Sequence, residues 1–410
     1  MSQAGLRAVC TALLLLAACN GSTPAADANV DVVSTDHALV DGLKQGEGRA
    51  PDKTSPDGPK PAPVWKPVSG TGPAVIQFTA TLLVDGRVLV AGGYDYPSPT
   101  QSVPQYKKQA WLYQPDTNSF VPAGEMKLAR ARHTASLLPD GRVLIAGGED
   151  DSNTHASTEL FDPKQAVASA WSAGPDLPGS RAGHVAVTLS DGQILMAGGY
   201  GSSTYLASFV IYKPSTNSFQ SPAASLSKAR ATIAATLLQN GKVLLAGGDD
   251  GSSAYSNIME TFNPSTGQVT LLKATMSDKK SGAFGFTLPS GKALITAGYA
   301  FAYPPRDDLF DPAADTVTAI NHPGGSARRS AAARLADGRV IVAGGFEDAQ
   351  KEKVRVFSEK VMAWDMLPNL LHARSRAALV TLKDGSVLAI GGEAYSGNIF
   401  VAEAERLYYP

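Results

Sequence analysis

Short stretches of alternating small and apolar residues recur along most of the chain, and the one from His133 to Leu138 shows the pattern well. It leads into Asp140-Gly141, after which Arg142 to Ala146 forms a second apolar run that ends at Gly147-Gly148. An Asp-Gly pair between two such runs is typical of a β-hairpin. The pattern therefore predicts two antiparallel strands joined by this turn.

The same hairpin pattern is repeated along the chain at a nearly constant spacing. Its turns are Asp85-Gly86, Asp140-Gly141, Asp191-Gly192, Asn240-Gly241, Ser290-Gly291, Asp337-Gly338 and Asp384-Gly385. Their glycines are 55, 51, 49, 50, 47 and 47 residues apart, and a glycine pair, or Ala297-Gly298 in the fifth unit, follows each turn. A fixed period of this length indicates one supersecondary unit copied many times.

Each period has room for two further strands after the hairpin. In the second unit a third strand ends at Asp162-Pro163, and a fourth begins near Trp171. Third strands of the same kind are WLYQP, FVIYKP, ETFNP, DLFDP, VRVFSE and RLYYP. Four antiparallel strands per period predict an all-β fold, a propeller with seven four-stranded blades.

The two ends of this repeated region complement each other. The last unit reaches Pro410 without a fourth strand, whereas Val64 to Pro67 reads as a fourth strand with no blade before it. Pairing the two would close the ring and cover both edges, which otherwise invite aggregation. We therefore expect a seven-bladed ring over residues 64–410 that is closed by an N-terminal strand.

The glycine pairs, the aromatic-x-Pro third strands and an arginine before the next first strand together resemble the kelch repeat family. The resemblance runs from about Trp65 to Pro410, and it implies a kelch-type β-propeller. Missing aromatic residues at Val269 and Thr316 are departures from the family pattern.

The first residues resemble a bacterial lipoprotein signal. Arg7 precedes an apolar stretch from Ala8 to Ala17, which is too short to span a bilayer, and Leu16-Ala17-Ala18-Cys19 resembles a lipobox. This predicts a signal peptide over residues 1–18 and a lipid on Cys19; an ordinary secretory signal is the alternative. Residues 19–63 are rich in Pro, Ala and Asp and are expected to form a disordered tether.

These features predict a protein anchored in the bacterial cell envelope. Asn20 after the cysteine favours the outer membrane, facing the periplasm or the cell surface. Cys10 is the only other cysteine, so the mature chain would have no disulfide and no cysteine metal site. A formal net charge of -1 without a basic run argues against nucleic acid as a partner. We expect a monomeric propeller whose partners are the membrane and an envelope protein or glycan.

Candidate ligand-binding residues lie in the loops that would meet at one face of the ring. After the glycine pairs come tyrosines and acids: Tyr94, Asp95, Glu149, Asp150, Tyr200, Asp249, Tyr299, Glu347 and Glu393. The loops entering the first strands supply arginines: Arg132, Arg181, Arg230, Arg328 and Arg374, with Arg130, Arg329 and Arg376 close to them in the same loops. Such side chains can stack on and hydrogen-bond a sugar or peptide and can hold an anion.

Two structural alternatives remain open for these side chains. The tyrosines can pack between blades, and the arginines can pair with acids on neighbouring strands, such as Glu159, Glu260, Asp308 and Glu405. The second alternative is favoured for the arginines, because a side chain that recurs in nearly every copy usually belongs to the scaffold.

No motif assigns a catalytic residue, a metal or a cofactor. His133 and His184 occupy equivalent repeat positions, and no metal-binding His spacing is present. Galactose oxidase is an enzyme with a kelch-like propeller, and its copper site needs a tyrosine cross-linked to a cysteine. The mature chain would have no cysteine for that bond, so the resemblance does not imply this activity.

A non-catalytic envelope binding module is the first hypothesis. The second is a carbohydrate-active enzyme, a sugar epimerase, mutarotase or lyase, with Glu149, Asp150 and Asp249 as acid-base candidates.

Overall fold

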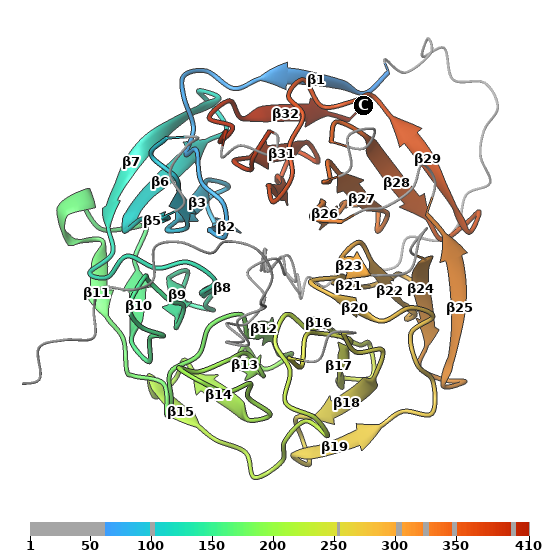
Figure 1. The fold of residues 1–410 in the computed structure, drawn as a ribbon. Helices are drawn as coiled ribbons and strands as arrows, with labels where there is room; N and C mark the ends of the chain where they lie inside the picture. Colours follow the sequence, from blue (N-terminus) through green and yellow to red (C-terminus); the bar gives the residue numbers. More distant parts are fainter. Residues whose placement is uncertain are drawn as a thin grey trace, which may run out of the picture.

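A computed structural model of the chain describes residues 62–98, 103–251, 255–300, 306–322, 328–346, 351–394 and 399–409. Cys19, Glu347 and Pro410 lie outside these ranges. Within them, seven four-stranded antiparallel sheets are arranged in a ring (Figure 1). This confirms the predicted seven-bladed all-β propeller.

The first four blades follow one another directly along the chain. Blade 1 consists of β2 (Thr79–Leu82), β3 (Val88–Ala91), β6 (Gln109–Gln114) and β7 (Ser119–Glu125). Blade 2 consists of β8 (Thr134–Leu137), β9 (Val143–Ala146), β10 (Thr158–Phe161) and β11 (Trp171–Ala173), with the 3₁₀ turn η1 (Val167–Ser169) before β11. Blade 3 consists of β12 (Val185–Thr188), β13 (Ile194–Ala197), β14 (Phe209–Lys213) and β15 (Ser218–Gln220). Blade 4 consists of β16 (Ala234–Leu237), β17 (Val243–Ala246), β18 (Met259–Asn263) and β19 (Gln268–Leu271).

The remaining blades complete the ring. Blade 5 consists of β21 (Phe284–Thr287), β22 (Ala293–Thr296), β24 (Arg306–Asp311) and β25 (Thr316–Asn321). Blade 6 consists of β26 (Ala331–Arg334), β27 (Val340–Ala343), β28 (Val354–Ser358) and β29 (Ala363–Leu367). Blade 7 consists of β30 (Ala378–Thr381), β31 (Val387–Ile390), β32 (Glu405–Tyr408) and β1 (Val64–Pro67). Two small hairpins, β4 (Tyr94–Asp95) with β5 (Gln105–Tyr106) and β20 (Lys280–Ser281) with β23 (Tyr299–Ala300), lie in the connections.

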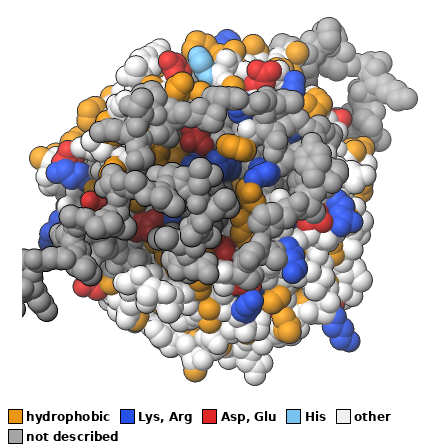
Figure 2. All heavy atoms as spheres, in the orientation of Figure 1, with side chains coloured by type: hydrophobic (Ala, Val, Ile, Leu, Met, Phe, Trp, Pro, Cys, Tyr) orange, Lys and Arg blue, Asp and Glu red, His pale blue; other side chains and the backbone are white. Residues whose placement is uncertain are grey.

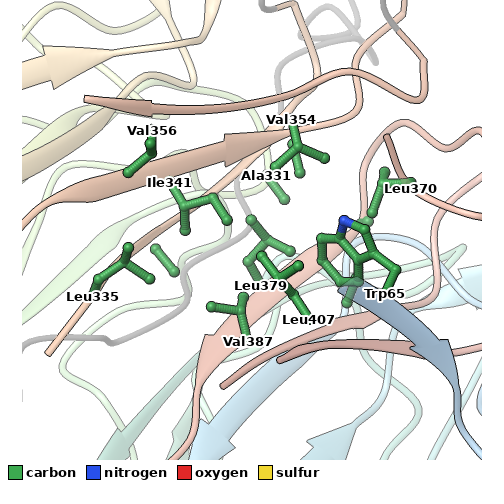
Figure 3. Packing of buried hydrophobic residues seen from close by; sticks show 14 residues of the cluster. Trp65, Ala331, Leu335, Ile341, Val354, Val356, Leu370, Leu379, Val387 and Leu407 are labelled. Atoms are coloured by element: carbon green, nitrogen blue, oxygen red, sulfur yellow. The ribbon is translucent and has the colours of Figure 1, made fainter. Parts of the chain in front are cut away.

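Strand β1 closes the ring as the sequence predicted. It pairs antiparallel with β32, and Trp65 stands opposite Leu407. The Trp65 side chain is only 4% exposed and packs between blades 6 and 7, against Leu370 and Leu379 (Figure 3). Burying an indole of this size contributes several kcal/mol, so the N-terminal strand stabilises the whole ring.

The core lies between the blades. Each second strand, such as β9 with the sequence VLIA, is buried along its whole length because both faces of a blade are covered by its neighbours. The first strands use small residues, for example Ala331, Ala332 and Ala333, where the blades converge near the axis. The second strands are therefore buried throughout, whereas each first strand keeps at least one half-buried residue.

The glycine pairs sit where the backbone of the next connection comes close. Gly147 has a φ of +65°, and a β-carbon there would lie 2.3 Å from the carbonyl oxygen of Arg181. Any larger residue would need both a strained backbone and a displaced neighbouring blade.

Among the described residues, no helix is long and apolar enough to cross a membrane.

Candidate functional site

One repeat position, two residues before the first strand of each blade, adopts the left-handed conformation in all seven blades. The residues there are Gln77, Arg132, Gly183, Thr232, Gly282, Arg329 and Arg376. Their backbones are hydrogen-bonded from blade to blade, with Arg132 N donating to Gln77 O at 3.0 Å, Gly183 N to Arg132 O at 3.0 Å and Arg376 N to Arg329 O at 2.8 Å. The scaffold thus brings residues about 50 positions apart into one ring around the axis.

A second set of equivalent residues follows the glycine pairs and lies beside the first. These residues are Tyr94, Glu149, Tyr200, Asp249, Tyr299, Phe346 and Glu393. Isolated antiparallel bridges join them to the neighbours of the first set, for example Ala131 to Glu149 and Ser375 to Glu393. We call the two sets together the mouth. Figure 2 shows Lys or Arg and Asp or Glu side chains near the centre of the face that it views.

Arg132 is fixed at the mouth by two directed contacts. Its Nη1 donates to the Tyr200 hydroxyl at 2.7 Å and lies 3.2 Å from Glu149 Oε1. Burial opposes the charge on Arg132, but Tyr200 and Glu149 outweigh it and raise the pKa of the guanidinium. Burial also raises the pKa of Tyr200, which therefore stays protonated. This part of the mouth is held together by its own side chains.

Arg329 and Arg376 come from neighbouring blades and share one carboxylate. The Nη1 atom of each lies 3.6 Å from Glu393 Oε1, to which the Ser375 hydroxyl donates at 3.1 Å. The Arg329 guanidinium also stacks on the Phe346 ring at 4.4 Å. Two cations and one anion are thus gathered between blades 6 and 7.

Aromatic rings surround the charged groups. Tyr94 contacts Tyr96 and Tyr106 with ring centroids 5.7 and 5.5 Å apart, and Tyr96 contacts Phe400 at 5.9 Å. Tyr94 is buried, whereas the other three rings are half-buried. Their partial exposure leaves apolar surface beside the charges, where a flat ligand can stack.

Tyr299 and Arg328 meet on another side of the mouth. The Arg328 guanidinium lies 3.8 Å from the centroid of the Tyr299 ring, a cation–π geometry. Tyr255 approaches Tyr299 edge-on at 5.4 Å. These predicted residues lie close together, although they come from different blades.

The predicted acids in the loops are largely engaged in local contacts. Asp95 lies 2.7 Å from Lys107 Nζ. Asp150 Oδ1 accepts from the backbone N–H groups of Ser152 and Asn153. Asp249 accepts from the Tyr205 hydroxyl at 2.9 Å. Within the described ranges, no three His, Cys, Asp or Glu side chains gather in a way that could hold a metal ion.

Three of the predicted arginines lie in the scaffold instead of the mouth. Arg230 pairs with Glu260, and Arg374 with Glu405 at 2.7 Å, each pair being fully buried within one blade. Arg181 has no such acid and donates to backbone carbonyls of Gly198 and Ser208. Because these side chains are 3% exposed or less, we leave them out of the candidate ligand site.

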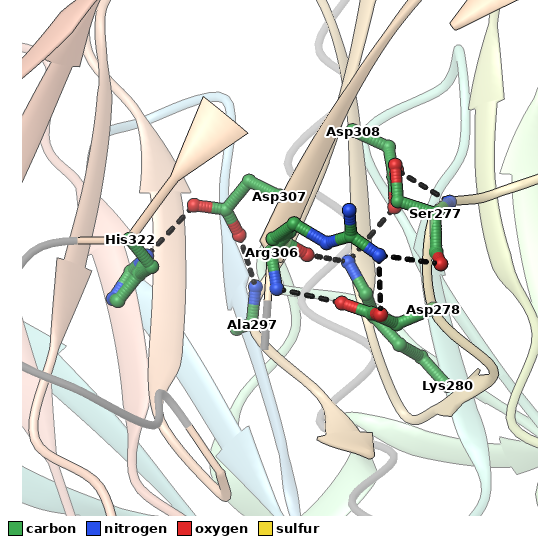
Figure 4. A network of polar contacts seen from close by, with 8 residues as sticks. All are labelled: Ser277, Asp278, Lys280, Ala297, Arg306, Asp307, Asp308 and His322. Carbon is green, nitrogen blue, oxygen red and sulfur yellow. Dashed lines mark hydrogen bonds and ion pairs between the residues drawn. The ribbon is translucent and has the colours of Figure 1, made fainter. Parts of the chain in front are cut away.

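The buried acids also hold the connections between blades. Glu405, for example, accepts from the backbone N–H of Leu371 in the connection that enters its blade. Asp308 does the same for Ser277, and its cationic partner is Lys280 at 2.9 Å rather than an arginine (Figure 4). The predicted pairing of repeat cations with repeat acids is therefore confirmed in these blades, with lysine replacing arginine in blade 5.

Blade 6 departs from this arrangement. Arg355 opposes Val342 in the sheet, a position equivalent to that of Glu405 opposite Ala389 in blade 7. Arg355 Nη1 lies 2.9 Å from His322 Nε2, and His322 Nδ1 lies 2.7 Å from Asp307 (Figure 4 shows Asp307 and His322). An Asp–His–Arg chain thus joins blades 5 and 6, whereas blades 2, 4, 5 and 7 each use an internal pair.

The two repeat histidines are buried structural residues. His133 Nε2 is hydrogen-bonded to the Thr79 hydroxyl at 3.0 Å, and His184 Nε2 to the Thr134 hydroxyl at 2.9 Å. Burial, with the nearby Arg130 guanidinium, lowers the pKa of His133 to about 3, and burial lowers that of His184 in the same direction. Both rings therefore stay neutral and join adjacent blades.

Sequence reasoning named Arg329 and Arg376 only among the entering-loop arginines, and it did not name Gln77 at all. All three stand 15 residues before the first glycine of their pairs, as Arg132 does. The Gln77 side chain is 1% exposed, and its amide nitrogen and oxygen have no hydrogen-bond partner among the described residues. Aligning the repeats on their glycines would have shown that this position varies from glycine to arginine.

Comparisons with known proteins agree with the fold. A profile of the KLHDC2/KLHL20/DRC7 Kelch-repeats domain matches residues 78–298, more than half of the chain. Human Kelch-like protein 33 is 30% identical over 145 residues, which cover 35% of this chain and 25% of that protein. The match thus spans only a quarter of the length of this curated relative.

Among solved structures, a fungal alcohol oxidase of the AA5 family in complex with copper superposes with a TM-score of 0.68. The superposition covers 85% of this chain and 77% of that one at 17% sequence identity, which shows likeness of fold alone. With the family profile matched over most of its first five blades, the chain belongs to the kelch-repeat β-propeller family.

Proposed function

We propose that this protein is a non-catalytic binding module that takes a glycan, peptide or protein partner at the mouth of its propeller. One observation carries the proposal: the glycine before each mouth residue of the second set is present in all seven blades and a buried cation–acid pair recurs in blades 2, 4, 5 and 7, whereas the left-handed position changes among glycine, threonine, glutamine and arginine. A position that only supported the ring would not need to differ in this way. A ligand that lacks sevenfold symmetry would need such differences.

The location of the module is part of the same proposal. A lipid on Cys19 would hold the chain at the bacterial cell envelope, and residues 20–63 would give the propeller reach from the membrane. A lipid-anchored ring in this position would meet envelope glycans and envelope proteins. Recognition would come from the mouth, and retention from the anchor.

Binding and turnover can be separated in one experiment. Full-length protein in detergent micelles is titrated calorimetrically with a panel of envelope glycans and peptides, and each mixture is then followed by NMR for product. The proposal expects saturable binding of at least one probe, with the probe unchanged afterwards. Conversion of the bound probe would overturn it in favour of an enzyme, and failure of every probe to bind would overturn the mouth as a ligand site.

A matched pair of variants locates the binding. Arg132→Lys keeps the charge but loses the planar fork that reaches Tyr200 and Glu149. We expect it to weaken binding, while Arg142→Lys on the opposite end of the blades, beside its turn residue Asp140, leaves affinity unchanged. Equal losses in both variants would place the ligand elsewhere.

A further inference from the structure

The contacts of Glu393 differ from those of the other mouth acid that meets an arginine. Glu149 lies 3.2 Å from Arg132, which is itself held by the Tyr200 hydroxyl at 2.7 Å. Glu393 lies 3.6 Å from each of Arg329 and Arg376, beyond the usual length of a charge-assisted hydrogen bond. One carboxylate is thus placed between two guanidiniums, farther from each of them than Glu149 is from Arg132.

The backbone of Glu393 is held independently of its carboxylate. Antiparallel bridges to Ser375 and Phe400 fix the backbone, so displacement of the carboxylate would change side-chain torsions and not these bridges. The Glu393 side chain is 13% exposed and accepts a hydrogen bond from the Ser375 hydroxyl. Rotation of a glutamate side chain costs far less than breaking a buried pair such as Arg374–Glu405.

Half-buried rings lie next to these charges. Tyr96 and Phe400 pack with centroids 5.9 Å apart. An isolated antiparallel bridge joins Phe400 to Glu393, so these rings lie beside the acid that the two arginines share. A ligand held at the guanidiniums would therefore lie against aromatic surface.

Resting on the proposed function, we propose that the mouth binds a glycan carrying a uronic-acid-type carboxylate, and that Glu393 is an internal stand-in for that carboxylate. The ligand carboxylate displaces Glu393 from Arg329 and Arg376, and its sugar ring stacks on Tyr96 and Phe400. Glu149, Asp249 and the displaced Glu393 then face the sugar hydroxyls, which donate hydrogen bonds to carboxylates.

The mixture of charges favours an acidic sugar over an acidic peptide. A single ligand carboxylate would replace Glu393 one for one beside Arg329 and Arg376, whereas a run of Asp and Glu would be repelled by Glu149 and Asp249 in the same mouth. Hydroxyl groups, by contrast, are donors that these acids accept. The site is therefore best matched to one negative charge on a hydroxyl-rich body.

The test uses the full-length protein in micelles and three probes: a glucuronate-containing disaccharide, the corresponding uncharged glucose disaccharide, and an acidic dipeptide. Glu393→Gln keeps the size of the side chain but removes its charge. We expect it to tighten binding of the glucuronate probe by about tenfold, which corresponds to about 1.4 kcal/mol, and to leave the neutral disaccharide unaffected. Arg376→Lys should lower the affinity for the glucuronate probe at least tenfold, and added salt should lower that affinity further.

Control measurements separate the outcomes. Glu125→Gln removes an acid whose side chain is 47% exposed and pairs with Lys108 away from the mouth, and it should change no affinity. Equal melting temperatures of the variants exclude a folding defect. Unchanged or weaker glucuronate binding in Glu393→Gln would overturn the internal stand-in, and binding of the dipeptide alone would overturn the glycan.

Different results would overturn the proposed function and the acidic-sugar inference. If another glycan or peptide of the panel binds at the mouth while the glucuronate probe does not bind wild type or Glu393→Gln, only the acidic-sugar inference is overturned. If no probe binds any variant, both are overturned. Binding of glucuronate to Glu393→Gln but not to wild type supports the stand-in, because it shows the internal carboxylate excluding the external one.

Discussion

Trp65 and Pro368 stand 303 residues apart in the sequence, yet the Trp65 indole N–H donates to the Pro368 carbonyl oxygen at 3.0 Å. The tryptophan belongs to β1, the N-terminal strand that completes blade 7, and the proline follows β29 of blade 6. Trp171 repeats this contact between blades 1 and 2 by donating to Ala123 at 2.8 Å. The first described strand therefore makes a blade-to-blade contact of the same kind as an internal one.

Replacing Trp65 by Ala should destabilise the ring strongly. The side chain is 4% exposed, and large-to-small changes of buried aromatic residues typically cost about 3–5 kcal/mol. Urea unfolding followed by circular dichroism measures the effect. Val64→Ala, at a neighbouring residue that is 46% exposed, is the matched control and should cost well under about 1 kcal/mol. Equal effects would mean that β1 contributes little to closure.

Removing one partner of a buried ion pair should lower the free energy of unfolding more than breaking an exposed ion pair does. Glu260→Ala leaves the Arg230 guanidinium, whose side chain is 0% exposed, without its carboxylate, and such losses are typically about 3–5 kcal/mol. Asp140→Ala breaks a pair whose side chains are 31% and 47% exposed, and should cost about 1 kcal/mol or less. Denaturant midpoints of the two variants test the difference. Similar midpoints would show that the Arg230–Glu260 pair does not stabilise the connection between blades 3 and 4.

Stability should fall as the solution becomes acidic, in a window set by the repeat histidines. Burial holds the pKa of His133 at about 3 in the folded ring and lowers that of His184. An unfolded chain protonates histidine near pH 6.5, so the stabilisation is complete above that pH. It is lost between pH 6.5 and about 3, by up to about 1.4 kcal/mol per pH unit for each ring.

Urea unfolding between pH 7.5 and 5 measures this slope above the range in which most carboxylates titrate. A His133→Gln, His184→Gln double variant should show a smaller slope, whatever its absolute stability. An unchanged slope in the double variant would mean that other groups take up the protons.

Cys19→Ser should release the protein from membranes. The prediction follows from the lipobox-like Leu16-Ala17-Ala18-Cys19, because without the thiol no thioether-linked lipid can form. Fractionation of expressing cells by ultracentrifugation, with immunoblotting of pellet and supernatant, measures the shift. Cys10→Ser serves as the control and should pellet like wild type. If Cys19→Ser also remains in the pellet, the anchor is excluded.

The local part of the fold could be predicted from the sequence, and the part that depends on curvature could not. Asp-Gly turns between alternating runs determine hairpins such as β8–β9, and β1 was recognisable because VWKP resembles the start of a fourth strand. The contact between Arg329 and Glu393 joins two blades, and it depends on how the ring bends. No short motif encodes that bend.

Repeat position was a better guide to role than residue type. Arg132 and Arg374 are both arginines of entering loops, but Arg132 lies in the mouth, whereas Arg374 forms a buried ion pair with Glu405. Within its repeat, Arg374 stands two residues before the position that Arg132 occupies. Lys280 is a different residue type in the same role, because it forms the buried ion pair with Asp308 that arginines form in other blades. Grouping the arginines by type therefore mixed scaffold with candidate ligand contacts.

The most direct test of a ligand site at the mouth is hydrogen exchange measured by mass spectrometry, with and without a saturating probe from the glycan and peptide panel. We predict slower exchange in residues 374–377 and 391–394, which carry Arg376 and Glu393, and no change at the turns around Asp140-Gly141 and Asp337-Gly338 at the other end of the strands. Protection confined to those turns or to outer strands such as β19 and β29 would contradict the account.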